Sequence, residues 1–149
     1  VLPENKALEV KKLQQQGNKA GFNRTPQRLA ILEYLEGNLS HPSAEDIYRA
    51  VSRKYHSMSF ATVYNTLNTL AKGGAVRELT IDPERRRYDP DTSRHHHLIC
   101  VDCRKVVDIA GDLAVEIPKT MTKDFTVFGN HVEFYGHCAP CGKKKKKKP

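Results

Sequence analysis

Residues 59–71 read SFATVYNTLNTLA, a serine followed by apolar residues at helical spacing. Ser59 is a favourable N-cap, and Val63, Leu67 and Leu70 recur at the interval that buries one face of a helix. The other face collects side chains with hydroxyl or amide groups: Ser59, Thr62, Tyr64, Asn65, Thr66, Asn68 and Thr69. The stretch predicts an amphipathic helix whose exposed face can form hydrogen bonds with another molecule.

Two further helices are expected before this one, after a mostly polar helix over residues 4–16. Thr25-Pro26 places a capping residue and a first-turn proline at the start of the first. The second begins at Ser43, where Asp46 three residues later resembles a capping box.

A hairpin is predicted after the third helix. Residues 75–81 read as one strand, 82–84 as a turn and 85–89 as the return strand. Three helices followed by a hairpin form a winged helix-turn-helix, in which the third helix enters the major groove and the wing rests on the backbone. The expected DNA-contacting residues are Ser59, Thr62, Tyr64, Asn65, Asn68, Arg85, Arg86 and Arg87.

The net charge of the 149-residue chain is +8, and its distribution is uneven. Basic residues outnumber acids over residues 1–90, acids outnumber bases over 91–142, and Lys143–Lys148 is a lysine run. This pattern suggests a module that faces nucleic acid joined to one with another task. The lysine run is expected to be a solvated end that strengthens phosphate attraction. No apolar run approaches the length of a membrane span, and the first residues lack the apolar core of a signal peptide.

All four cysteines lie in two C-x-x-C pairs, Cys100/Cys103 and Cys138/Cys141. Two such pairs predict a closed four-thiolate zinc site with a structural role. Two disulfides would need an oxidising compartment. A thioredoxin-like redox pair needs a following helix to lower the thiol pKa, and a lysine-rich tail is expected here instead. Purely structural packing is the third alternative.

The C-terminal half is predicted to be a small α/β unit. Strands are expected at 95–101, 105–109, 125–128 and 132–136, with a helix at Leu113–Met121. The resulting fold class is α+β, and the sheet or helix could pair with a second copy. The predicted division is residues 1–88 for DNA binding, 89–91 as hinge, 92–142 for metal binding and dimerisation, and 143–149 as tail.

A second metal site is indicated beside the cysteines. Strand alternation sends His95 and His97 to one face, and His41, Asp89 and Asp108 could add further ligands. Three imidazoles and two carboxylates suit Fe(II), Mn(II) or Zn(II) better than a metal that prefers thiolates.

The whole chain resembles the ferric uptake regulator (Fur) family of metal-dependent bacterial repressors. Thr25–Arg28, His41–Tyr48 and Ser59–Leu67 are similar to its DNA-binding domain, and His95–Cys103 and Glu133–Cys138 to its dimerisation domain. The resemblance implies a regulatory site at His41, Asp89, His95, His97 and Asp108.

Aspartate at both carboxylate positions, Asp89 and Asp108, is closer to the peroxide-responsive PerR branch of the family, since the iron-responsive branch usually has glutamates there. The resemblance implies that iron with peroxide oxidises His41 or His95. It also implies a homodimer. Where the iron-responsive branch carries an additional site, this chain has Arg94, and its Asn130 replaces an expected histidine.

We therefore expect a cytoplasmic, homodimeric repressor of operator DNA with structural zinc and regulatory Fe(II) or Mn(II), not an enzyme. An iron-responsive repressor is the nearest alternative. A metalloenzyme with a His/Asp site, and a DNA-binding protein that is active without a regulatory metal, are the alternatives from other classes.

Overall fold

The computed structural model describes residues 15, 23–81, 85–111, 113 and 115–146, and the chain divides into two compact units between Thr92 and Ser93. This boundary follows directly after the Asp89-Pro90-Asp91 segment that the sequence indicated as a hinge. The helix expected at 4–16 and the turn expected at 82–84 lie outside the described residues. Of the helices in the described part, none has the length and apolar character needed to cross a bilayer.

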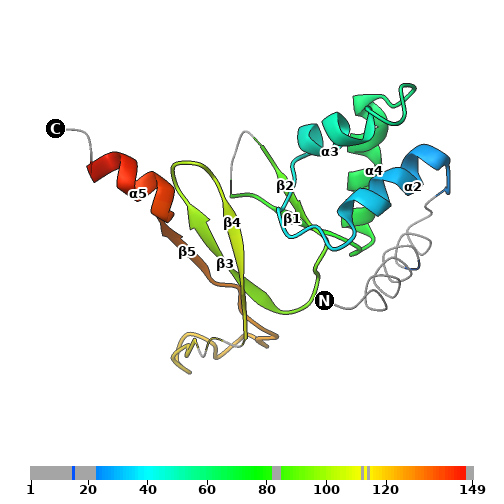
Figure 1. Cartoon of the computed structure of the whole chain (residues 1–149). Helices are drawn as coiled ribbons and strands as arrows, with labels where there is room; N and C mark the ends of the chain where they lie inside the picture. Colours follow the sequence, from blue (N-terminus) through cyan, green and yellow to red (C-terminus); the bar gives the residue numbers. More distant parts are fainter. Residues whose placement is uncertain (1–14, 16–22, 82–84, 112, 114, 147–149) are drawn as a thin grey trace. The chain divides into compact units, whose positions relative to one another are not determined.

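The N-terminal unit contains α2 (Pro26–Leu35), α3 (Ala44–Val51) and α4 (Phe60–Lys72), followed by the hairpin β1 (Arg77–Leu79) and β2 (Arg87–Asp89) (Figure 1). The three predicted helices and the hairpin are confirmed. Their apolar faces meet in one fourteen-residue buried cluster, to which all three helices contribute. This core fixes the direction in which the polar face of α4 points.

Local capping explains where these helices begin. The Thr25 hydroxyl accepts a hydrogen bond from the Arg28 amide at 3.3 Å, and the Ser59 hydroxyl accepts one from the Thr62 amide at 3.0 Å. At α3 the capping box is complete, because the Asp46 carboxylate accepts from the Ser43 amide at 3.1 Å and Ser43 Oγ accepts from the Asp46 amide at 3.2 Å.

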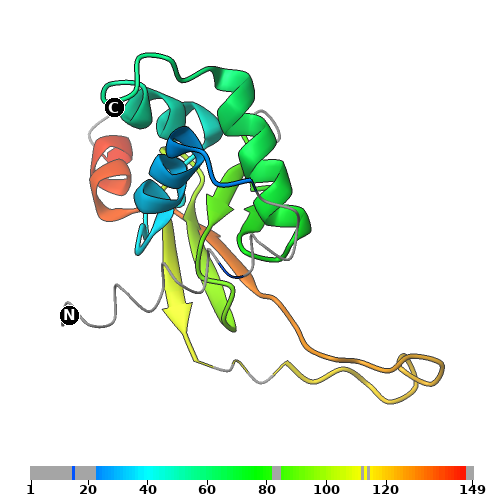
Figure 2. The same cartoon turned by 90° about the vertical axis from the view of Figure 1, so that its right-hand side faces the viewer.

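The C-terminal unit is built on a three-stranded sheet in the order β4-β3-β5. β3 (His95–Cys100) pairs antiparallel with β4 (Val106–Ala110) and parallel with β5 (Glu133–Gly136). Figure 2 shows the connection from β4 to β5 extending away from the sheet as a long excursion. The chain then forms α5 (Ala139–Lys146).

Two predicted elements of this unit are wrong. The described residues between 113 and 121 form no helix, because Pro118 removes a backbone donor and its ring clashes with the preceding turn. The chain turns there instead, with the Met121 amide donating to the Pro118 carbonyl at 2.9 Å. Residues 125–128 form no strand, since no neighbouring strand pairs with them in the described sheets.

The helix α5 was not predicted. The sequence predicts a tail at the lysine run, but residues 139–146 form a helix that begins directly after Cys138. A helix therefore begins inside the second C-x-x-C pair, so the lack of a helix is no argument against a redox pair.

Candidate metal centres and nucleic-acid interface

The four cysteines converge at one end of the β3–β5 pair. Cys100 ends β3, and its register partner Gly136 ends β5 two residues before Cys138. Between the first two cysteines the chain makes a tight turn closed by the Arg104 amide on the Cys100 carbonyl at 2.9 Å, with Arg104 at a positive φ of 59°. All four sulfur atoms lie within 4.8 Å of one another, and all four cysteines are thiols.

The spacing of the sulfur atoms fits a tetrahedral zinc ion. Zinc–sulfur bonds of about 2.3 Å require neighbouring sulfurs to be about 3.8 Å apart. Cys103 Sγ and Cys138 Sγ lie 3.7 Å apart. This convergence favours the zinc interpretation over a redox pair, because a redox pair needs only two of the four thiols.

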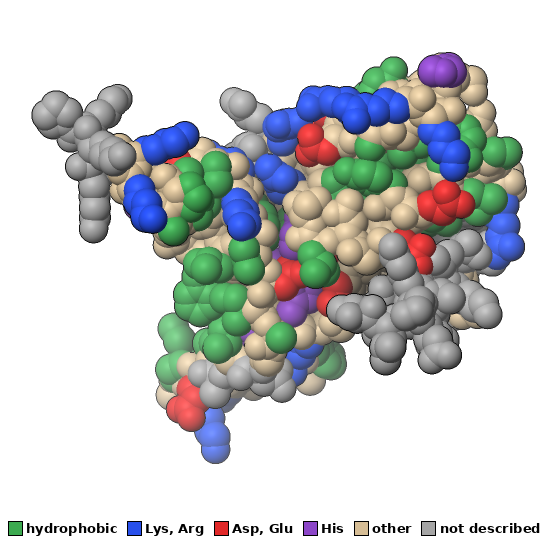
Figure 3. Space-filling model, viewed as in Figure 1, with side chains coloured by type: hydrophobic (Ala, Val, Ile, Leu, Met, Phe, Trp, Pro, Cys, Tyr) green, Lys and Arg blue, Asp and Glu red, His purple; other side chains and the backbone are tan. Residues whose placement is uncertain are grey.

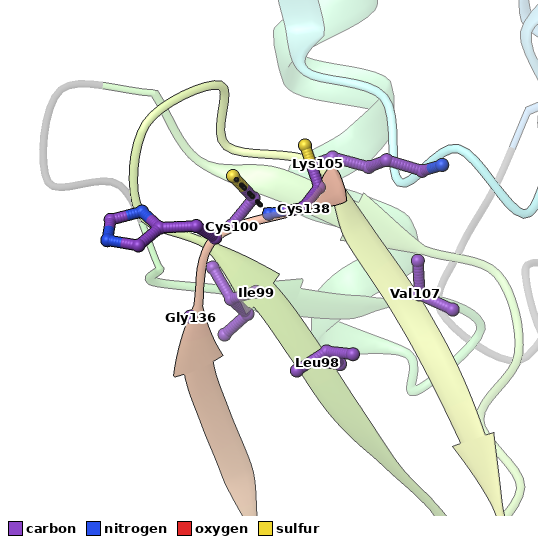
Figure 4. A pocket seen from close by; sticks show the side chains of 8 residues that line it. Leu98, Ile99, Cys100, Lys105, Val107, Gly136 and Cys138 are labelled. Carbon is purple, nitrogen blue, oxygen red and sulfur yellow. Dashed lines mark hydrogen bonds between the residues drawn. The ribbon is translucent and has the colours of Figure 1, made fainter. Parts of the chain in front are cut away.

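Backbone amides favour the thiolate of Cys100. Hydrogen bonds from the amides of Cys103 and Cys138 lower the pKa of its thiol to about 6. The Cys138 amide donates to Cys100 Sγ at 3.3 Å, as Figure 4 shows. Hydrogen bonding to the neighbouring thiol of Cys138 raises the pKa of Cys141. A zinc ion would hold all four as thiolates.

The histidines of β3 form a second cluster within the same unit. His95 and His97 share a face of the strand, with His95 Nε2 and His97 Nε2 2.9 Å apart. The register places Asp108 of β4 opposite His97, and its Oδ1 lies 3.6 Å from His97 Nε2 and 3.7 Å from His95 Nε2. His95 and His97 are buried.

The hydrogen bonds around His95 leave its Nε2 available as a ligand. His95 Nδ1 lies 3.1 Å from the Ser93 carbonyl, which can only accept, so Nδ1 is assigned the proton and Nε2 carries a lone pair. That lone pair points at His97 Nε2. A proton or a metal ion between the two nitrogens satisfies both. Metal–nitrogen bonds of about 2.1 Å at right angles would separate two ligand nitrogens by about 3.0 Å, so the donor set fits a first-row divalent metal.

His96 points away from this cluster. It is buried, and its Nδ1 accepts from the Val132 amide at 3.1 Å. The alternation expected from the strand is confirmed, and His96 serves to attach the β4–β5 connection.

The N-terminal unit contributes its own His/Asp pair. His41 and Asp89 are buried, with His41 Nε2 3.8 Å from Asp89 Oδ2. The loop holding His41 runs along β2, where the Tyr88 amide donates to the Pro42 carbonyl at 3.0 Å and Ser43 forms a bridge with Arg87. His41 has a φ of 50°, a strained value for a non-glycine residue that is typical of functional sites.

Arg87 supports this strained residue, a role that the sequence analysis missed. Its Nη1 donates to the His41 carbonyl at 3.1 Å. Arg85 likewise contacts its own unit, with Nη2 3.4 Å from Ser43 Oγ and 3.7 Å from Asp46 Oδ1. Arg86 is the most exposed of the three, and its Nη1 lies 2.9 Å from Glu78 Oε1. Of the three hairpin arginines, Arg85 and Arg87 thus contact the loop and helix of their own unit, and Arg86 is exposed on the surface.

The polar face of α4 is open to solvent. Ser59, Tyr64 and Asn65 are exposed, whereas Thr62 and Asn68 are half-buried. Thr66 does not belong to this face: it is buried, and its hydroxyl donates to the Thr62 carbonyl at 2.6 Å. A depression of about 200 Å³ lies between α4 and the hairpin, lined in part by Tyr64, Arg85 and Arg86.

A winged helix and a thiolate-stapled sheet with a His/Asp cluster together define a metal-binding, DNA-binding type of regulator. The model of the ferric uptake regulator family matches residues 19–135. The chain belongs to the ferric uptake regulator family.

Several relatives are similar over most of the chain. The peroxide operon regulator of Bacillus subtilis (strain 168) is 42% identical over 140 residues, covering 93% of this chain and 97% of the relative. The peroxide-responsive repressor PerR of Staphylococcus epidermidis (strain ATCC 12228 / FDA PCI 1200) is 41% identical over 125 residues, covering 83% of each.

Solved structures have the same fold. The ferric uptake regulator Fur of Helicobacter pylori superposes with a TM-score of 0.71 at 22% identity, covering 91% of this chain and 93% of that one. The structure of GAS PerR-Zn-Zn has a TM-score of 0.51 at 30% identity, covering 94% of this chain and 90% of that one.

Proposed function

We propose that this chain is a metal-dependent DNA-binding repressor that responds to peroxide. The observation that carries the proposal is the set of donor atoms, which consists of buried imidazoles and two aspartates and contains no thiolate. Such a set suits Fe(II) or Mn(II) better than a metal that prefers thiolates. Two relatives that match most of the chain are named a peroxide operon regulator and a peroxide-responsive repressor, which supports the same function.

The regulatory ion would join the two half-sites. His41 and Asp89 belong to the N-terminal unit, and His95, His97 and Asp108 to the C-terminal unit. We propose that all five ligate one Fe(II) or Mn(II). Because the Asp89-Pro90-Asp91 segment connects the units, a shared ion would fix the angle between them. The difference in metal affinity between the closed and open arrangements of the units is then the free energy that couples metal binding to DNA binding.

Peroxide would break this arrangement by modifying a ligand. Fe(II) supplies the redox chemistry when bound. One oxygen atom of H2O2 is inserted at a ring carbon of His41 or His95 and the other leaves as water, a two-electron oxidation of the imidazole. The modified ring is a poorer ligand, so the ion no longer fixes the angle between the two units and repression ends. Mn(II) does not readily carry out this chemistry, so the manganese form should persist.

The DNA surface would be the polar face of α4 with the hairpin beside it. Exposed Tyr64 and Asn65 can reach base edges, and Asn is suited to adenine. The depression between α4 and the hairpin, with Arg85 and Arg86 along it, can receive a backbone phosphate. Figure 3 shows Lys and Arg side chains gathered on the helical part of this unit.

The C-terminal unit would pair with a second copy of itself. Leu98 is paired with Val107 on one side and with Phe134 on the other, so a row of three exposed apolar side chains crosses the sheet. Hydrophobic side chains gather over this sheet in Figure 3. The β4–β5 connection adds further exposed apolar side chains, at Val115, Ile117, Met121, Phe125, Val127 and Phe128. Apolar surface of this extent is typical of an interface.

We further propose that the chain acts by binding, not by turnover, and that it works in the cytoplasm. Its relatives are named as regulators and repressors. Four reduced cysteines in a zinc site and a DNA partner both suit a reducing compartment.

DNA binding with and without metal tests the proposal. A duplex selected from random sequences in the presence of Mn(II) should bind the zinc-containing protein only when Mn(II) or Fe(II) is added. Peroxide should abolish binding of the Fe(II) form and leave the Mn(II) form unchanged. Equal affinity without added metal would identify a DNA-binding protein without metal control. Peroxide resistance of the Fe(II) form would identify an iron-responsive repressor.

A further inference from the structure

His97 has both of its ring nitrogens engaged. Nε2 faces His95 and Asp108, as described above, while Nδ1 lies 3.3 Å from His131 Nε2. The His97 side chain is fully buried, so no water shell is available to decide which nitrogen holds the proton. The neighbours of the two nitrogens decide it, and an ion bound at Nε2 leaves the proton to Nδ1.

The sheet explains why His131 lies there. β5 runs parallel to β3 with Glu133 opposite His97, and the His97 amide donates to the Val132 carbonyl at 3.2 Å. His131 therefore enters beside the His97 ring, with the two ring centroids 5.1 Å apart at 60°. Glu133 Oε1 lies 3.6 Å from His131 Nε2, and the Tyr135 hydroxyl donates to the other oxygen of Glu133. A line of polar groups thus backs the buried imidazole.

His97, His131 and Glu133 hold donor atoms within 4.8 Å of one another and could be considered a metal site of their own. A neutral imidazole, however, has one nitrogen with a lone pair and one that carries a proton. If His97 ligates the regulatory ion through Nε2, its Nδ1 is protonated and cannot bind a second ion. His131 and Glu133 then influence how His97 binds the regulatory ion and do not bind an ion of their own with it.

We propose that His131 accepts the Nδ1–H of His97 and is the positioning residue that keeps His97 Nε2 deprotonated and aimed at the regulatory ion. Metal-binding histidines commonly donate their other N–H to an acceptor in this way, which fixes the tautomer and the ring orientation. Here the acceptor is a second histidine, whose Nε2 carries the lone pair; Glu133 Oε1, 3.6 Å from that nitrogen, lies beyond hydrogen-bond distance and does not take its place. The proposal rests on the regulatory site proposed above.

The test compares Mn(II) affinity among variants of the full-length, zinc-containing protein. His131→Leu removes the acceptor, whereas His131→Gln keeps an oxygen that can accept. His56→Leu, which removes an exposed histidine of the other unit, is the matched control. We expect about tenfold to hundredfold weaker Mn(II) binding for His131→Leu. His131→Gln should recover most of the loss, and His56→Leu should leave the affinity unchanged.

A spectroscopic measurement needs no variant. With diamagnetic Zn(II) in the regulatory site, ¹⁵N NMR should show a slowly exchanging Nδ1–H on His97 and a scalar coupling from that nitrogen to His131 Nε2. A merely structural role for His131 would produce neither signal.

Two outcomes separate the inference from the proposed function. If His97→Ala binds Mn(II) as wild type does, the proposed regulatory site is wrong. If His97→Ala loses Mn(II) binding but His131→Leu does not, the site stands and the role of His131 is overturned. His131→Gln as weak as His131→Leu, or the absence of coupling between His97 Nδ1 and His131 Nε2 with Zn(II) bound, would also overturn it.

Discussion

Removal of the four-cysteine site should unfold the C-terminal unit and spare the N-terminal one. Among the described residues after Thr92, the buried hydrophobic side chains are Ile99, Cys100 and Val106. Full burial of one such side chain contributes about 1.5–3 kcal/mol. A structural zinc ion contributes about 10–16 kcal/mol. The ion, where bound, therefore outweighs the apolar core of its own unit, whereas the N-terminal unit has a fourteen-residue cluster.

The perturbation is Cys103→Ala, with Val101→Ala as control because Val101 lies in the same turn and ligates nothing. Native-state hydrogen exchange followed by mass spectrometry is the assay. Cys103→Ala should lose bound zinc and the protection of residues 95–110 and 133–136, while α2, α3 and α4 keep theirs. The control should retain both.

The reasoning would be refuted by a Cys103→Ala protein that lacks zinc yet protects β3, β4 and β5 as wild type does. In that case the sheet would be stable without the ion, and the apolar row on its face would have to contribute more through self-association than its burial in one chain indicates.

Three further substitutions test individual contacts. Arg86→Ala should weaken binding to any duplex and reduce the slope of log affinity against log salt by about one, measured by fluorescence anisotropy with Arg53→Ala as control. Leu98→Asp should shift the sedimentation coefficient from dimer to monomer, since a charge would interrupt the apolar row. Asp46→Asn should lower the free energy of unfolding by about 1 kcal/mol in urea titrations. Partial burial raises the pKa of Asp46, but hydrogen bonds from Ser43 and the Arg85 charge outweigh burial and lower the pKa overall. The contribution of Asp46 to stability is therefore fully present above pH 3.8, its usual pKa, and is lost as the pH falls through its lower pKa in the folded protein.

Local signals in the sequence were sufficient for the N-terminal unit. Thr25, Ser43 and Ser59 cap the helices in the structure as their types and spacings predict. Each cap acts within three residues, so no long-range information is needed. The same locality explains the zinc pairs, since each C-x-x-C turn is set by its own residues and the β3–β5 register brings the turns together.

The β4–β5 connection could not be read in this way. A helix is expected from the sequence at Leu113–Met121, but Pro118 opposes it, and the apolar side chains of this connection are exposed, so no packing within the described part of the chain imposes a helix. Side-chain contacts that depend on the register between strands could not be predicted from the sequence either. Nothing in the spacing of His97 and His131, 34 residues apart, indicates that the two rings meet.

The most direct measurement is the mass spectrum of tryptic peptides after brief peroxide treatment of the zinc-containing protein, with the cysteines alkylated after the treatment and before digestion. Peptide 29–49 carries His41 from the N-terminal unit, and peptide 95–104 carries His95 from the C-terminal unit. The proposed Fe(II) site predicts a gain of one oxygen atom on a histidine in peptide 29–49 or peptide 95–104, absent with Mn(II) and suppressed in Asp108→Glu. Unmodified histidines and intact DNA binding after peroxide treatment of the Fe(II) form would contradict it.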